Sequence, residues 1–272
     1  MVEHPDPSPI ELGDGVDGMP ERTRRAFQSH ADQQLDRVQE TLSEIERVYR
    51  SDPTAVVSCS GGKDSMALLA LADMADCDHR VFHWDWGSRL IPREIAQQLV
   101  DNIRQFVPDD RLYVASRGYA QVVRYPQADG FWHTLVHGDD ISDSDGSLAR
   151  QAGALRRADH VGIQILGLRS QESGKRARKL EQSGLFGESL DQPAAFPIRE
   201  WSARDVWAFI VDWEIPYPDH YDRAATVIGN GGPRSYERAR FTTFHDPEFE
   251  DLAGAVMGIA EWRTKNKLQK RR

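Results

Sequence analysis

The residue types and spacing that point most directly to chemistry lie in one hexapeptide, Ser60-Gly61-Gly62-Lys63-Asp64-Ser65. Paired glycines let a backbone approach an anion closely and adopt dihedral angles that a side chain would forbid. The N–H groups that open a helix have no partner within it, and the helix dipole favours negative charge there. Lys63 adds a positive charge, and the two serines add hydroxyl donors. An apolar stretch precedes the hexapeptide and a helical pattern follows it, so the sequence predicts a strand, a glycine turn and a helix that hold phosphate.

The spacing is not that of the Walker loop, which places four residues between its first glycine and the Gly-Lys-Ser/Thr ending. A glycine turn without a ligand is the structural alternative. The hexapeptide instead resembles the PP-loop of the ATP pyrophosphatases, which cleave ATP between the α and β phosphates. The resemblance implies ATP and Mg²⁺ as cofactors, all six residues as nucleotide ligands, and Lys63 and Asp64 as catalytic residues. Ser58, near the end of the predicted strand, joins the predicted nucleotide ligands.

Asp85 follows the second predicted strand, in the run Trp84-Asp85-Trp86-Gly87. This run resembles the phosphoadenosine-phosphosulfate reductase family, which has an acidic residue and a glycine at this place. At the carboxyl end of a parallel strand, Asp85 could accept a hydrogen bond from a ribose hydroxyl, or bind Mg²⁺ together with Asp64. A turn or helix-capping aspartate is the alternative.

A second likeness to this family runs from Gly167 to Arg176, in the sequence Gly-Leu-Arg-Ser-Gln-Glu-Ser-Gly-Lys-Arg. It resembles the family's substrate segment, Gly-X-Arg-X-X-X-Ser-X-X-Arg, which Arg169, Ser173 and Arg176 match. The resemblance implies that Gly167 and these three residues bind the nucleotide. It also implies that Arg169 is a catalytic residue that orients the second substrate or the α-phosphate, since arginine suits bidentate recognition of phosphate or sulfate. A solvated basic helix face is the alternative.

The segment from Pro197 to Trp207, with Ile215-Pro216-Tyr217 after it, resembles a third stretch of the family, Pro-Leu…Trp-Ser…Asp-Val-Trp…Ile-Pro-Tyr. Within it, Ser202 is a predicted helix N-cap and Asp205 completes a capping box. This segment predicts architecture rather than chemistry.

The chain has two cysteines, Cys59 and Cys77. They are too few for a disulfide framework or for a four-cysteine iron–sulfur or zinc site, and we expect both to be small apolar residues of the interior. The reductases of the family carry a Glu-Cys-Gly-type segment near their end, whose cysteine attacks the sulfonyl group. This chain has no cysteine after Cys77, which favours ATP cleavage over reduction of a sulfonucleotide. We expect no iron–sulfur cluster.

The resemblance therefore favours a Mg²⁺-dependent ATP pyrophosphatase that forms AMP and pyrophosphate and adenylylates an acceptor in sulfur transfer. Its specific version is DNA phosphorothioation, with a cysteine desulfurase as the sulfur-donating partner. Other enzymes remain open: a sulfonucleotide reductase that uses an external thiol, or a sulfate- or flavin-adenylylating enzyme. An alternative of another class is a non-catalytic nucleotide-binding subunit that regulates a partner.

The elements that must position these residues alternate between strand and helix. This alternation predicts an α/β fold, a Rossmann-like doubly wound parallel sheet whose ligands bind at the carboxyl ends of the strands. The predicted elements are a helix from 20 to about 50, strand 55–59, helix 64–75, strand 80–85, helix 92–106, strand 111–115, a helix at about 148–158, strand 163–168, a loop at 184–191, strand 196–198 and helix 203–213. We expect a disordered arm over 1–18, a domain over 19–222 that includes the N-terminal helix, and an irregular C-terminal extension over 223–272.

The formal net charge of −9 at pH 7 argues against bulk electrostatic wrapping of nucleic acid. It permits local contacts with DNA, for which the basic segment 169–179 and the basic tail after residue 264 are candidates. No apolar run approaches the roughly 18 residues of a spanning helix, and the N-terminus lacks a signal-peptide pattern. We therefore expect a cytoplasmic protein without membrane contact, and a homodimer stays possible.

Overall fold

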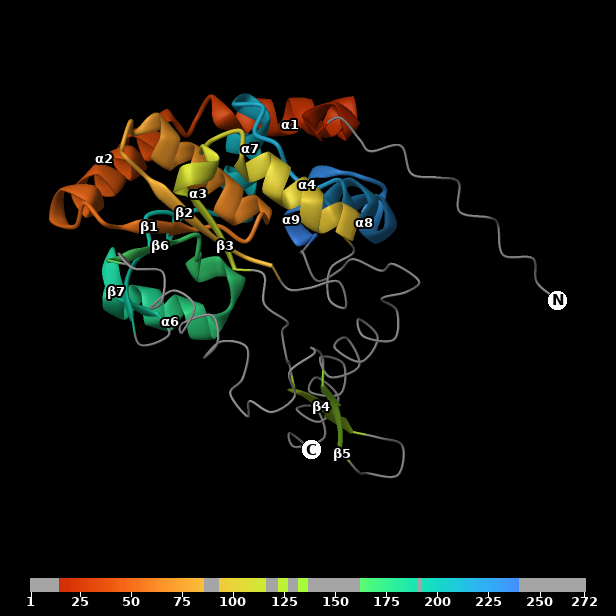
Figure 1. The fold of residues 1–272 in the computed structure, drawn as a ribbon. Helices are drawn as coiled ribbons and strands as arrows, with labels where there is room; N and C mark the ends of the chain where they lie inside the picture. The colour runs from red at the N-terminus through yellow and green to blue at the C-terminus, as the bar shows by residue number, and fades with distance from the viewer. Residues whose placement is uncertain are drawn as a thin grey trace.

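A mostly parallel sheet of six strands forms the centre of the molecule (Figure 1). The computed structural model describes residues 15–85, 93–115, 122–126, 132–136, 162–189 and 192–239. The sheet has the order β3-β2-β1-β6-β8-β7, and only the edge strand β7 is antiparallel to its neighbour. Its strands are β1 (Val56–Ser58), β2 (Arg80–Trp84), β3 (Leu112–Ala115), β6 (Gln164–Leu166), β7 (Phe186–Ser189) and β8 (Gln192–Ala195). The predicted α/β fold is confirmed.

The order of the strands reverses at β1. The chain leaves β1 for β2 and β3 on one side, and it returns to β6 on the other side, so Val57 pairs with Val81 and with Ile165. In open α/β sheets, the connections after two such strands diverge and leave a crevice at their carboxyl ends. The loop after β1 and the loop after β6 both reach this switch point.

Helices cover the sheet in layers (Figure 1). Helix α3 (Lys63–Met74) follows β1 and lies against it, with α2 (Leu35–Ser51) and α7 (Ala203–Asp212) on the outer side. Because α3 is enclosed in this way, Leu68, Leu69 and Leu71 are fully buried. The other helices are α1 (Glu21–Ala31), α4 (Arg93–Ile103), α6 (Gly174–Ser183), α8 (His220–Gly229) and α9 (Pro233–Arg238), with short 3-10 turns at Gly15–Gly18, Asp109–Arg111 and Ser170–Glu172.

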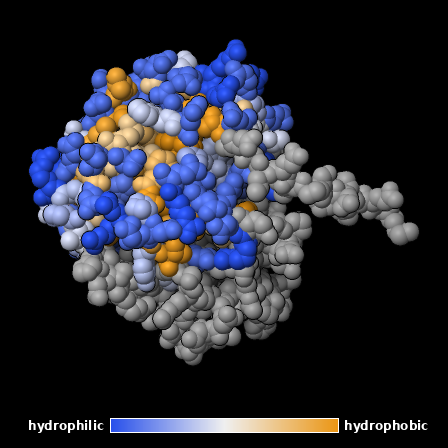
Figure 2. All heavy atoms as spheres, turned by 45° about the horizontal axis from the view of Figure 1, so that its top comes forward, coloured by the Kyte–Doolittle hydropathy of each residue, from blue (hydrophilic) through white to orange (hydrophobic). Residues whose placement is uncertain are grey.

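The outer helical layer is polar where it faces solvent. Figure 2 shows mainly hydrophilic side chains on this face, with hydrophobic ones in small patches. Among the described residues, none of the helices is long and apolar enough to cross a membrane.

The N-terminal helix predicted from 20 to about 50 is wrong in one respect, because it is two helices. Helix α1 packs on α7, where Phe27 stacks on Trp207, whereas α2 packs on α3. The chain turns between them at 32–34, and Gln34 is buried at the turn. Apolar residues continue at helical spacing through this turn, so the pattern did not reveal that the two halves cover different helices.

The loop predicted at 184–191 is also wrong in part, because β7 occupies residues 186–189. Its residues pair with β8 in an antiparallel ladder, for example Gly187 with Ala194. The pairing partner, rather than an apolar alternation, makes this segment a strand. The strand predicted at 196–198 is wrong in its position, because the strand, β8, ends at Ala195. Residues 197–200 form a turn in which Ile198 is buried.

The structure contains regular elements in two further regions where the sequence predicted none. Residues of the predicted irregular extension form the end of α8 and all of α9. A separate antiparallel pair, β4 (Val122–Pro126) and β5 (Trp132–Val136), lies between β3 and β6 in sequence. The disordered arm predicted over 1–18 is wrong at its end, because Gly15–Gly18 forms a 3-10 turn. Residues 1–14, the helix predicted at about 148–158 and the basic tail lie outside the described residues.

Candidate functional site

The loop between β1 and α3 is closed by its own serines. Ser65 Oγ donates to the carbonyl of Gly62 at 2.9 Å and accepts from the N–H of Ser60 at 3.2 Å. Gly61 has a φ of +79°, and a Cβ at this position would lie 2.6 Å from Leu99 Cδ2. Both the dihedral angle and the close neighbour therefore require glycine here. The predicted strand, glycine turn and helix are present, with residues 60–62 as the turn between β1 and α3.

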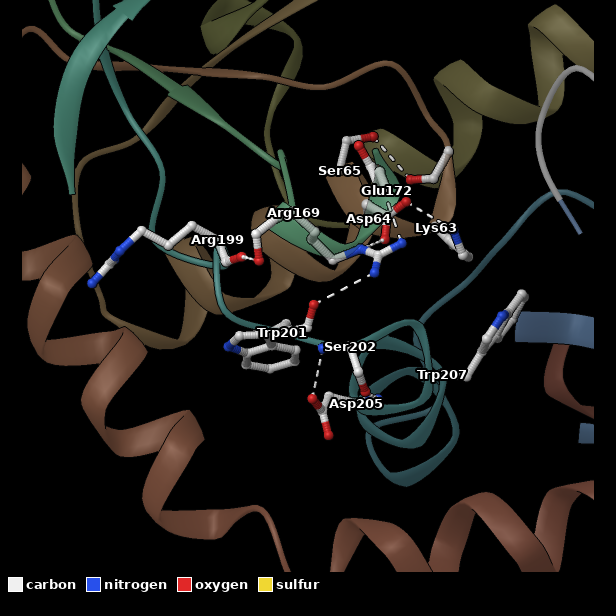
Figure 3. A network of polar contacts seen from close by, with 12 residues as sticks. Lys63, Asp64, Ser65, Arg169, Glu172, Arg199, Trp201, Ser202, Asp205 and Trp207 are labelled. Carbon is white, nitrogen blue, oxygen red and sulfur yellow. Dashed lines mark hydrogen bonds and ion pairs between the residues drawn. The ribbon is translucent and has the colours of Figure 1, made fainter. Parts of the chain in front are cut away.

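Two buried cations share one carboxylate at the start of α3 (Figure 3). Lys63 Nζ lies 2.8 Å from Asp64 Oδ2, and Arg169 Nε donates to Asp64 Oδ1 at 2.6 Å. Lys63 is 5% exposed and Arg169 is 4% exposed. Residues far apart in sequence thus meet at the switch point, where Glu172, 3.9 Å from Arg169, adds a second carboxylate to the two cations.

Asp64 is held in its charged form by these neighbours. Burial by itself would raise the pKa of Asp64, but the charges and hydrogen bonds of Lys63 and Arg169 outweigh it and lower the pKa below its usual range. Arg169 also donates to the carbonyl of Trp201 at 3.4 Å, which ties the site to the turn before α7. The guanidinium of Arg169, which we predict to contact substrate, is therefore held by hydrogen bonds to both Asp64 and Trp201.

Gly167 lets the loop after β6 lie directly against α3. A Cβ at Gly167 would be 2.9 Å from the carbonyl oxygen of Asp64 and 3.2 Å from the backbone nitrogen of Ser65. This contact is between two backbones, so neither can move aside as a side chain would. Gly167 belongs to the site through this close approach, which brings Arg169 within reach of Asp64.

Ser173 and Arg176 lie at the start of α6, outside the network of Lys63, Asp64 and Arg169. The Ser173 side chain caps α6 by accepting from the N–H of Arg176 at 3.2 Å, and both residues are exposed. Glu172 forms an ion pair with Arg176 and lies 3.9 Å from Arg169. Glu172 therefore links the predicted residues to the buried network, a connection that the sequence analysis missed.

The two carboxylates predicted to bind Mg²⁺ already face cations. Asp64 contacts Lys63 and Arg169, while Asp85, directly after β2, accepts two hydrogen bonds of 2.8 Å from Arg93. Within the described ranges, no three acidic, histidine or cysteine side chains are arranged to hold a metal ion. This arrangement does not fit a metal ion held by these two carboxylates.

Ser58 and the cysteines complete the set of predicted residues. The buried Ser58 Oγ has no hydrogen-bond partner among the residues that the structure describes. Burial raises the pKa of the Cys59 thiol to about 11, and it also raises the pKa of Cys77. Both thiols therefore stay protonated at neutral pH, which makes them poor nucleophiles.

Tyr221 is a site residue that the sequence analysis did not predict. Its hydroxyl accepts a hydrogen bond of 3.2 Å from the N–H of Lys63, and its ring centroid lies 5.9 Å from Lys63 Nζ. The two residues are 158 positions apart. Tyr221 follows the Ile215-Pro216-Tyr217 run closely, and that position was the one hint in the sequence that it belongs to the site. No local pattern connects this run with the Ser60–Ser65 loop.

Comparison with protein families finds one matching domain. A model of the phosphoadenosine phosphosulfate reductase domain matches residues 54–232, which include the loop, Arg169 and Tyr221. No curated protein sequence matches the chain significantly.

Two solved structures are similar at low identity. The phosphoadenylyl-sulfate (PAPS) reductase from Candida auris, in a phosphate complex, is 15% identical, with a TM-score of 0.43, over 72% of this chain and 91% of that one. The U34-tRNA thiolase NcsA from Methanococcus maripaludis, solved with its [4Fe-4S] cluster, is 12% identical, with a TM-score of 0.35, over 74% of this chain and 78% of that one. The domain model covers more than half of the chain, and on that ground this protein belongs to the phosphoadenosine phosphosulfate reductase domain family.

Proposed function

We propose that this protein is an ATP pyrophosphatase that cleaves ATP to AMP and pyrophosphate and adenylylates an acceptor in sulfur transfer. Family membership supports a nucleotide-utilising enzyme of sulfur metabolism. The observation that carries the proposal is the pair of buried cations, Lys63 and Arg169, beside the glycine turn at the switch point of the sheet. A lysine and an arginine beside the backbone N–H groups that open a helix suit a polyphosphate.

The chemistry requires positioning more than a protein nucleophile. An acceptor oxygen attacks the α-phosphorus of ATP, the bond from that phosphorus to the bridging oxygen breaks, and pyrophosphate leaves with the bonding electrons. Lys63 offsets the charge that develops on the leaving group, and Arg169 holds the Asp64–Lys63 pair in place. A sulfur nucleophile then displaces AMP from the adenylylated acceptor.

Mg²⁺ belongs to this proposal as the counter-ion that arrives on the phosphates of ATP, where it would lower their charge. The protein contributes the loop backbone and the two cations. This division follows from the contacts of Asp64 and Asp85, which are both directed at basic side chains.

The specific version of the proposal has DNA as the acceptor and a cysteine desulfurase as the sulfur-donating partner. The exposed side chains of Arg178 and Lys179 on α6 support contact with a polyanion close to the site. A sulfonucleotide reductase is the second candidate, because the family is named for that activity. It would require an external thiol, since burial raises the pKa of both Cys59 and Cys77.

The test is pyrophosphate release from ATP with Mg²⁺ and a panel of acceptors. We expect Lys63→Ala to lower the release rate by roughly 100-fold or more, because a charge on the leaving group loses its partner. Arg50→Ala is the matched control, since Arg50 is exposed on α2, where it forms a surface ion pair with Glu46 at 3.5 Å. It should keep the wild-type rate.

Other results would favour the other candidates. Tight ATP binding without turnover, with every acceptor, contradicts the pyrophosphatase and favours the regulatory subunit. Sulfite release from a sulfonucleotide in the presence of an external thiol, without pyrophosphate release from ATP, favours the reductase.

A further inference from the structure

Tyr221 contacts Lys63 at two places, its backbone N–H and its ammonium group. The hydroxyl accepts from the backbone N–H of Lys63, and the ring lies beside the ammonium group of the same residue. Tyr221 is 2% exposed, so these contacts are fixed by the interior of the protein rather than by a mobile surface side chain.

The surroundings of Tyr221 hold the ring in one orientation. It packs edge-on against Trp207 of α7, with ring centroids 5.3 Å apart, and stacks on His220 at 4.4 Å. The next residue, Asp222, accepts hydrogen bonds from Tyr217 at 2.9 Å and from Tyr236 at 2.5 Å. Helix α8 is thus anchored at two successive positions, Tyr221 and Asp222.

A phenol hydroxyl can accept one hydrogen bond and donate another. Tyr221 uses its acceptor side for Lys63, and its O–H proton has no acceptor among the described residues. Burial raises the pKa of Tyr221, so the hydroxyl keeps this proton at neutral pH. A donor is therefore available beside the N–H group and the ammonium of the phosphate loop.

We propose that Tyr221 is a further phosphate ligand, whose hydroxyl donates to a phosphate oxygen of the nucleotide while it holds the first turn of α3. The inference rests on the proposed function for the identity of the ligand, an adenine nucleotide polyphosphate. It adds a residue from α8 to a site that is otherwise built from the loops after β1 and β6.

The test compares the affinities of three probes, ATP, pyrophosphate and adenosine, by titration calorimetry. We expect Tyr221→Phe, which removes only the hydroxyl, to weaken ATP and pyrophosphate by roughly 10-fold, as for a lost hydrogen bond to a charged group. Adenosine, which has no phosphate, should bind both forms of the protein equally.

Tyr217→Phe is the matched control. Tyr217 is also buried and loses a hydroxyl from the same cluster, but its hydrogen bond goes to Asp222 rather than to Lys63. The control should keep the wild-type affinity for pyrophosphate. An unchanged pyrophosphate affinity in Tyr221→Phe, an equal loss for adenosine, or an equal loss in Tyr217→Phe overturns the inference.

The same data separate this inference from the proposed function. A wild-type protein that binds ATP and pyrophosphate without releasing pyrophosphate contradicts ATP cleavage, and the affinities of Tyr221→Phe still decide the role of the hydroxyl. Absence of binding of both phosphate probes to the wild type overturns both.

Discussion

At the scale of single residues, two partly buried carboxylates, Asp64 and Asp222, have opposite pKa shifts. Asp64 lies between Lys63 and Arg169, and these cations lower its pKa against the effect of burial. Within the described part of the chain, Asp222 accepts hydrogen bonds from two tyrosine hydroxyls, and burial raises its pKa to about 6 in spite of them. The neighbouring Asp219 adds to this increase.

The pKa of Asp222 predicts a pH-dependent cost of folding. The folded state binds this proton more tightly than the unfolded state, whose pKa is near 3.8, so stability falls as the pH rises from 3.8 through about 6. Asp222→Asn removes the charge and keeps an amide oxygen that both tyrosines can use. We expect this variant to be more stable than the wild type at about pH 8, by about 1–2 kcal/mol, and the difference to disappear at about pH 4.

Urea unfolding at the two pH values checks this expectation, with Asp73→Asn as the control for the loss of one exposed negative charge. A difference between Asp222→Asn and the wild type that does not change with pH would contradict it.

At the scale of elements, α7 depends on its N-terminal capping box. Ser202 Oγ accepts from the N–H of Asp205 at 3.0 Å, and Asp205 accepts in return from the N–H of Ser202 at 2.7 Å. Asp205 also forms a hydrogen bond of 2.7 Å with His30 of α1 and an ion pair with Arg37 of α2. One cap therefore joins three helices of the outer layer.

We expect Ser202→Ala to lower the free energy of unfolding by about 1 kcal/mol, because one N–H of the first turn loses its acceptor. Unfolding in urea measures the change, and Ser202→Asn should restore most of it. Ser43→Ala is the control, since this serine is exposed on α2 and bonds only the carbonyl of Gln39. Equal losses in Ser202→Ala and Ser43→Ala would show that the cap contributes nothing.

At the scale of the whole molecule, the contact between Gly167 and the first turn of α3 joins the two halves of the sheet. The chain crosses from β3 back to β6, and Gly167 is where that return meets the backbone of Asp64. The geometry of the site therefore depends on how closely these two segments approach.

We expect Gly167→Ala to destabilise the protein by about 1–3 kcal/mol, since the added methyl group forces two backbones apart. Pyrophosphate release should fall with it, because Arg169 moves relative to Asp64. Gly174→Ala is the control, as a Cβ there meets nothing within 4 Å. Thermal unfolding of both variants is the measurement, and a Gly167→Ala protein as stable as the control contradicts this account.

The sequence by itself determined the features that depend on neighbours along the chain. The Ser60–Ser65 loop, the α/β alternation and the capping box of Ser202 with Asp205 are local patterns, because glycine dihedral angles, apolar periodicity and caps act within a few residues. The structure confirms the fold and contains these local features.

Only the tertiary structure decided which residues meet at the switch point. Arg169 lies 105 positions from Asp64, and Tyr221 lies 158 positions from Lys63, so their pairing depends on the crossover of the sheet and on the packing of α8. The same holds for β7, which is a strand because β8 supplies its partner. The sequence thus predicted a loop that holds phosphate, and the packing decided that its lysine contacts a tyrosine 158 positions away and its aspartate an arginine 105 positions away.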